Sequence, residues 1–78
     1  MPATKFTWIR DRSGYSPMPE HLLPMMAVTE YATLNVFPAA GTWKIYSRGR
    51  LLSGGAGKDT VALQMAAEQS YMELFPEL

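Results

Sequence analysis

The strongest alternation of apolar and polar positions lies in the second half of the chain. From residue 42 to residue 47, large apolar side chains alternate with polar ones, and aromatic and β-branched residues dominate. This pattern predicts a half-buried strand. Arg48 and Gly49 predict a tight turn, after which residues 50–53 predict a returning strand that the glycine-rich residues 54–57 end.

A C-terminal helix is predicted over residues 60–75. This stretch contains no Gly or Pro and is rich in Ala, Leu, Met, Gln and Glu, which favours a helix of about four turns. Asp59 stands at the N-cap position, where its carboxylate can accept hydrogen bonds from free backbone N–H groups. Pro76 ends the helix.

Two apolar stripes run along this helix. A step of about 100° per residue places Val61, Met65 and Met72 in one stripe, flanked by Phe75 and Ala62, and we expect this stripe to lie on the sheet. The second stripe needs another surface, which is the proline-rich segment before residue 27, the same helix in a second copy, or a partner. Its members are Leu63, Ala67, Tyr71 and Leu74.

Residues 27–37 predict a second clear strand. Alternation assigns one face to the core, with Val28, Ala32, Leu34 and Val36. The opposite face carries Thr29, Tyr31, Thr33, Asn35 and Phe37. Residues 38–41 form a loop of hairpin length, so this strand is expected to pair antiparallel with residues 42–47 and to bring Trp43 and Ile45 into the core.

The N-terminal part gives weaker signals. Residues 5–9 predict a first strand with Phe6 and Trp8 on one face, and residues 10–14 predict a charged loop. Prolines at positions 17, 19 and 24 exclude a long helix from residues 16–26. One helical turn is expected there, beginning at Pro19 and ending by Leu23, because the residue before a proline disfavours helix.

Length and composition limit the function classes. A chain of 78 residues predicts one domain, residues 1–78, whose core is small or shared between subunits, so a homodimer through the C-terminal helix stays open. Seven basic residues balance seven acidic ones, and this balance lacks the electrostatic signature of a nucleic-acid binder. There is no Cys, no apolar run of the roughly 20 residues that a membrane span needs, and no secretory signal. We expect a cytoplasmic protein without a membrane partner.

The glycine-rich segment before the helix invites comparison with phosphate-binding loops. In a P-loop a Gly lies five residues before the Gly-Lys pair and a hydroxyl follows the Lys, but this chain has Leu52 and Asp59 at those places. An acidic side chain at a helix N-terminus repels phosphate. A turn capped by Asp59 is therefore the preferred interpretation.

The same segment resembles the end of a double-stranded-RNA-binding domain over about 20 residues, with Ala62, Ala66 and Ala67 at similar spacing. The resemblance implies a lysine cluster that contacts RNA phosphates. This chain has Asp59, Thr60 and Leu63 at those places and only Lys58 is basic. Close packing of small residues on a sheet explains the alanines without RNA.

His21 is the only histidine, with Glu20 beside it. One His without Cys or a second His does not make a metal site, and adjacent residues in a helical turn diverge by about 100°. We therefore assign no catalytic residue, metal ligand or cofactor and expect that the protein is not an enzyme.

A predicted aromatic and basic sheet face is the preferred candidate for partner binding. Tyr and Arg are the side chains most enriched at interface hot spots. The candidate residues are Tyr31, Phe37, Lys44, Tyr46, Arg48 and Arg50. Two alternatives stay open for this face: stacking of single-stranded bases, and ordinary cross-strand packing or cover by the N-terminal segment.

Together these elements predict an α+β fold with an antiparallel sheet of three to four strands and a C-terminal helix packed on one face. In size and layout it resembles the small inhibitors that phages and other mobile elements encode, anti-CRISPR proteins among them. The resemblance is one of architecture, without a shared motif. It implies a non-enzymatic protein that binds and occludes a host protein or complex, with a small nucleic-acid-binding accessory protein as the alternative.

Overall fold

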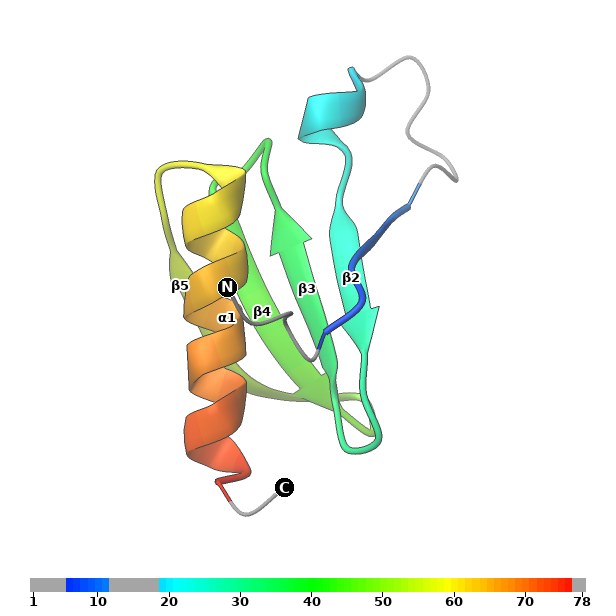
Figure 1. Cartoon of the computed structure of the whole chain (residues 1–78), viewed down its shortest axis with the longest axis vertical. Coiled ribbons are helices and arrows are strands. Elements are labelled where there is room, and N and C mark those ends of the chain that lie inside the picture. The colour runs from blue at the N-terminus through cyan, green and yellow to red at the C-terminus, as the bar shows by residue number, and fades with distance from the viewer. Residues whose placement is uncertain (1–5, 12–18, 77–78) are drawn as a thin grey trace.

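A five-stranded antiparallel sheet with one helix across it forms the protein in the computed structural model, which describes residues 6–11 and 19–76 (Figure 1). The strands are adjacent in chain order, β1-β2-β3-β4-β5. The α+β class and the C-terminal helix are confirmed, but the predicted count of three to four strands is wrong. The elements are β1 (Ile9–Arg10), the 3-10 helix η1 (Glu20–Leu22), β2 (Met25–Val28), β3 (Thr33–Phe37), β4 (Thr42–Ser47), β5 (Arg50–Ala56) and α1 (Thr60–Leu74).

A turn that the sequence did not reveal accounts for part of the difference. The predicted strand over residues 27–37 is a hairpin, in which β2 pairs antiparallel with β3. Thr29 closes the turn: its backbone N–H donates to the Ala32 carbonyl at 2.9 Å, and its hydroxyl accepts from the Ala32 N–H at 3.0 Å. A hydroxyl that bonds to nearby backbone stabilises a turn without Gly or Pro. The turn reverses the alternation, so Ala27 is buried and Val28 is exposed, contrary to the prediction.

The centre of the sheet agrees with the sequence. β3 and β4 form the expected hairpin, with Val36 opposite Trp43 and Leu34 opposite Ile45. All four side chains are buried on the face that α1 covers. α1 packs mainly on β3 and β4 (Figure 1).

β5 continues through the glycines that were expected to end it. Gly54 lies opposite Lys44, and Gly55 lies opposite Trp43. The indole of Trp43 lies where a Cβ on Gly55 would be, so this glycine allows close approach of a side chain rather than a turn. A register shift between Ile45 and Tyr46 places a bulge in the first half of β5.

Turn and cap residues confirm the predicted starts of β5 and α1. Arg48 has φ 54° and Gly49 has φ 78°, the left-handed pair that a tight hairpin turn requires. Asp59 caps α1 by accepting the Ala62 N–H on Oδ1 at 2.8 Å. The helix begins at Thr60 and ends at Leu74, one residue before the predicted end.

The helix faces the sheet with the opposite stripe from the predicted one. Leu63, Ala67 and Tyr71 are buried, whereas Val61 and Met65 are exposed. Small Ala67 in the middle of the buried stripe lets the helix lie close to the sheet. Val61, Met65 and Met72 therefore form an exposed apolar stripe on the outer side of α1.

The N-terminal segment packs on the helix side. Phe6 meets Tyr71 edge to face, with 5.4 Å between ring centroids, and Trp8 Nε1 donates to Glu68 Oε2 at 2.7 Å. The regular strand is shorter than predicted and lies later, since β1 contains only Ile9 and Arg10. The predicted helical turn near Pro19 is confirmed as η1, while most of the predicted charged loop lies outside the described residues. No described helix is both long and apolar enough to span a membrane.

Candidate protein-binding surface

The sheet face away from α1, the open sheet face, is the first part of the candidate surface. Residues directly opposite one another in an antiparallel pair share a face. Cross-strand pairing therefore places Val28, Thr33, Tyr46 and Leu51 in one row. Ile9, Met26, Asn35 and Lys44 form the next row. Phe37 and Thr42 begin a third.

The open sheet face is largely apolar and aromatic. Val28 is 69% exposed, Leu51 is 57% exposed and Ile9 is 53% exposed. Lys44 is the only charged member of these rows, and its Nζ lies 6.0 Å from the centroid of the Phe37 ring. Exposed aliphatic side chains on one sheet face, with Phe37 and Tyr46 on the same face, make this face a candidate interaction surface.

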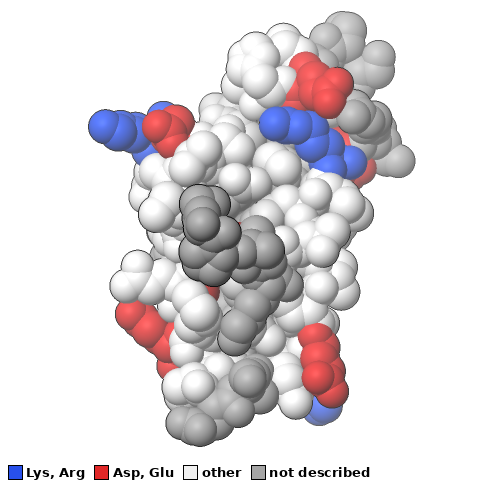
Figure 2. All heavy atoms as spheres, viewed as in Figure 1, with Lys and Arg blue, Asp and Glu red and all other residues white. Residues whose placement is uncertain are grey.

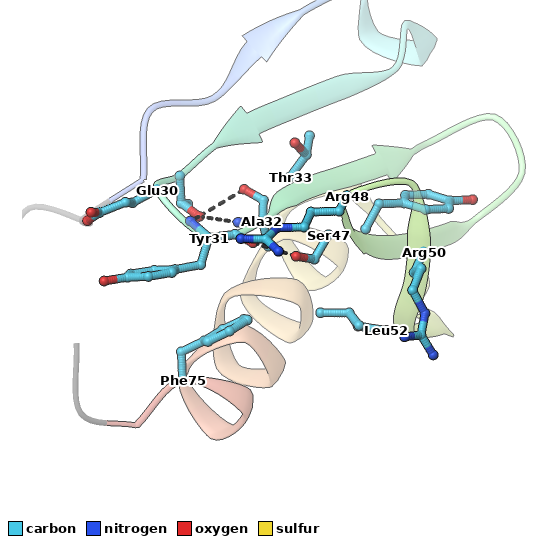
Figure 3. A pocket seen from close by; sticks show the side chains of 11 residues that line it. Glu30, Tyr31, Ala32, Thr33, Ser47, Arg48, Arg50, Leu52 and Phe75 are labelled. Carbon is cyan, nitrogen blue, oxygen red and sulfur yellow. Dashed lines mark hydrogen bonds between the residues drawn. The ribbon is translucent and has the colours of Figure 1, made fainter.

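A hollow of about 550 Å³ lies at one end of the sheet and forms the second part of the candidate surface. We call it the end pocket (Figure 3). It lies between the β2–β3 turn, the β4–β5 turn and the C-terminal end of α1. Its lining includes Tyr31, Tyr46, Arg48, Arg50, Leu52 and Phe75.

Aromatic contacts build the inner wall of the end pocket. Tyr31 stacks on Phe75 with 5.7 Å between ring centroids, and Phe75 contacts Tyr71 at 4.9 Å. Ser47 Oγ donates to the Tyr31 carbonyl at 2.8 Å and so ties the β2–β3 turn to the end of β4. Arg50 extends away from the stacked rings in the close-up (Figure 3). The pocket therefore combines an apolar wall with cationic groups at its rim.

The six predicted binding residues are only partly brought together. Phe37, Lys44 and Tyr46 lie on the open sheet face as expected. Arg48 and Arg50 lie at its end, where they line the end pocket with Tyr46. Tyr31 does not share that face: it lies in the β2–β3 turn and stacks on Phe75 of the helix side, because the missed turn changes its direction.

Three exposed apolar residues of this surface were not predicted. Val28 was assigned to the core because the Thr29 turn was missed. Leu51 lies opposite Tyr46, so the predicted turn at residues 48 and 49 carried enough information to find it. Ile9 ends the predicted first strand, in which only Phe6 and Trp8 were assigned to a face.

The other candidate motifs form no site among the described residues. His21 is exposed, and the carbonyl of neighbouring Glu20 accepts from Arg10 Nη1 at 2.7 Å. Within residues 6–11 and 19–76, no three His, Cys, Asp or Glu side chains gather as metal ligands. The Asp59 carboxylate, which follows the glycine-rich segment, is engaged by the helix backbone.

Charges on the helix side lie at its margins. Figure 2 shows this side, where the described Lys, Arg, Asp and Glu side chains that are visible gather near the corners. Basic and acidic groups are interspersed there, without the single-sign stripe that follows a nucleic-acid backbone.

Comparison of the chain with models of protein families, with curated proteins and with solved structures found no match in any of the three.

Proposed function

We propose that the protein is a non-enzymatic protein-binding module that uses the open sheet face and the end pocket. The observation that carries this proposal is the row Val28, Thr33, Tyr46 and Leu51, which crosses β2 to β5 on the side that α1 leaves uncovered and ends in two exposed aliphatic side chains. Burying such a row releases about 25 cal/mol for each Å² of apolar surface removed from water.

The residue types favour a protein partner. The row contains an aromatic residue with a hydroxyl between two exposed aliphatic residues, and arginines lie at its end. Interface centres are rich in Tyr and poor in charge, whereas their rims are polar. The row from Val28 to Leu51 has this arrangement, with no charged member and with Arg48 and Arg50 near its end.

Nucleic acid is the weaker alternative. Binding to a phosphate backbone depends on several cations along the path of the strand. The open sheet face has aromatic rings at Phe37 and Tyr46, but Lys44 is its only charged residue in the rows named above. Arg48 and Arg50 add charge only at one end.

An inhibitor of a host complex is the narrower form of this proposal. A small domain that covers a partner's surface inhibits by occlusion and needs no chemistry of its own. The resemblance to phage-encoded inhibitors suggests this form, but a layout shared by many functions transfers none of them. The identity of the partner is a matter for experiment.

Light scattering on a sizing column tests the proposal. The chain is measured alone and after mixing with lysate from the source cell, either untreated or nuclease-treated. We expect a discrete complex of protein that forms at both low and high salt. Loss of the complex on nuclease treatment, or a steep loss of affinity with salt, would favour the nucleic-acid alternative. A dimer that captures nothing would overturn the proposal.

A further inference from the structure

The outer edge of β5 is a second surface, and no described strand pairs with it. β5 is the longest strand, and β4 occupies only one of its sides because the sheet ends there. Proteins commonly protect such edges with Pro, inward-pointing Lys or bulges. β5 contains no Pro or Lys, and its bulge lies before Ser53, so residues 53–56 present a regular edge.

Backbone hydrogen bonds show which groups point outward. The Gly57 N–H donates to the Gly41 carbonyl at 3.1 Å, which makes these two a hydrogen-bonded pair. Such pairs alternate with non-bonded pairs along an antiparallel ladder. The backbone groups of Gly55 therefore face β4, and those of Gly54 and Ala56 face away from it.

The side chains along this edge leave the backbone accessible. Residues 54–56 carry no side chain larger than a methyl group, and all three are exposed. Part of this composition has an internal cause, because Trp43 requires a glycine at position 55. For an added strand the consequence is the same, because no side chain of residues 54–56 is large enough to block its approach.

Charge and apolar surface continue from the edge into the end pocket. Arg48 lies in the β4–β5 turn and Arg50 begins β5, and neither forms an ion pair with another described residue. Among the described residues that line the end pocket, Glu30 is the only carboxylate. Leu52, which is 39% exposed, joins Phe75 in the same lining.

We propose that β5 receives an extended acidic and apolar segment of the protein partner as an added strand. The segment bonds to the outward N–H and C=O groups of Gly54 and Ala56, places an apolar side chain against Leu52 and Phe75, and sets a carboxylate against Arg48 or Arg50. Main-chain bonds supply affinity in such strand addition, and side-chain pockets supply specificity. The proposal rests on the proposed function and specifies the partner's chemistry.

A second copy of the chain fits the edge less well. Antiparallel self-pairing of β5 sets the start of one strand beside the end of the other. Arg50 of one copy then lies near the end of β5 in the other copy, where Lys58 follows the strand. The neighbouring Asp59 carboxylate is occupied by the helix cap. An acidic foreign strand therefore complements the edge better than the chain itself does.

Selection from a display library of random dodecapeptides, followed by NMR of the isotope-labelled chain, tests the proposal. We expect enriched peptides to combine Asp or Glu with Val, Ile or Leu. Bound peptides should shift the amide resonances of Gly54 and Ala56 and slow their hydrogen exchange. The amide of Gly55 should change little, because it already faces β4.

Matched variants separate strand addition from other binding. Ala56→Pro removes an outward N–H without removing a bond to β4, whereas Ala56→Val keeps that N–H, so only the proline variant should lose binding. The double variant Arg48→Glu, Arg50→Glu should weaken the binding of acidic peptides about tenfold or more, and selection on it should enrich basic peptides instead.

Three outcomes would overturn the inference: no enrichment of peptides, enrichment of peptides that shift only Tyr46 and Lys44 of the open sheet face, or protection of the Gly54 and Ala56 amides by dimerisation of the chain alone. The second of these outcomes would leave the proposed function intact. Loss of partner capture in the light-scattering experiment would instead remove the proposed function itself.

Discussion

A Cβ atom on Gly55 would lie 2.7 Å from Nε1 of Trp43, closer than side chains approach one another. The indole of Trp43 therefore packs directly on the backbone of β5. This contact joins the buried centre of the sheet to its exposed edge strand, because Trp43 is itself only 8% exposed.

Gly55→Ala should lower the free energy of unfolding by about 1–3 kcal/mol, because the added methyl group overpacks a rigid ring. Chemical denaturation measures the loss. Trp43→Phe is the matched background, since it removes the indole atoms nearest to the added Cβ. The Gly55→Ala cost should shrink there, and an equal cost in both backgrounds would contradict the contact.

Leu63 and Met65 test which side of the helix faces the sheet. Leu63 is fully buried, so Leu63→Ala should lower the free energy of unfolding by about 2–5 kcal/mol. Met65 is 64% exposed, and Met65→Ala should stay within about 0.5 kcal/mol of the parent. If Met65→Ala instead lowered the midpoint of thermal unfolding more than Leu63→Ala, the Met65 stripe would face the sheet, as the sequence suggested.

Asp59 should stabilise α1 through its side-chain oxygen rather than through its charge alone. Asp59→Ala removes the acceptor of the Ala62 N–H and should cost about 0.5–2 kcal/mol. Asp59→Asn keeps an acceptor and should cost much less, since Asn caps helices about as well as Asp. Equal losses by urea denaturation would argue against the hydrogen bond.

Arg48 occupies a backbone conformation that favours Asn or Gly, with φ 54°. Arg48→Asn should therefore raise the free energy of unfolding by roughly 0.5–1 kcal/mol through relief of backbone strain. The same change should weaken peptide binding at β5, because it removes a rim cation. Calorimetry and peptide titration of one variant measure both effects. Lower stability together with unchanged binding would refute both.

The turn, the helix cap and the helix end that were predicted correctly have short-range sequence signals. The Arg48–Gly49 turn, the Asp59 cap and the stop at Pro76 each depend on residues adjacent in sequence. The Thr29 turn was missed because it lies between residues that favour strands and has no Gly or Pro. One missed turn then misplaced Val28 and Tyr31, since the alternation changes across the turn and Val28 shares a face with Thr33 rather than with Leu34.

The helix orientation and the role of Gly55 depend on contacts between distant residues. Both helical stripes are apolar, so periodicity alone did not decide between Met65 and Leu63. The small Ala67 beside Leu63 was the available signal for close packing. Gly55 was interpreted as a strand end because its partner, the Trp43 indole, lies on another strand. The predicted binding residues were misplaced in the same way wherever their face depended on strand register, as at Tyr31.

Capture of protein from nuclease-treated source lysate by two matched variants tests the central claim most directly. Val28→Ser, Leu51→Ser alters the open sheet face, and Val61→Ser, Met65→Ser alters the outer stripe of α1. All four side chains are more than half exposed, so both variants should fold. We predict that quantitative mass spectrometry finds the captured protein lost with the first variant and retained with the second. Retention by the first variant and loss by the second would move the binding surface to the helix and contradict the account.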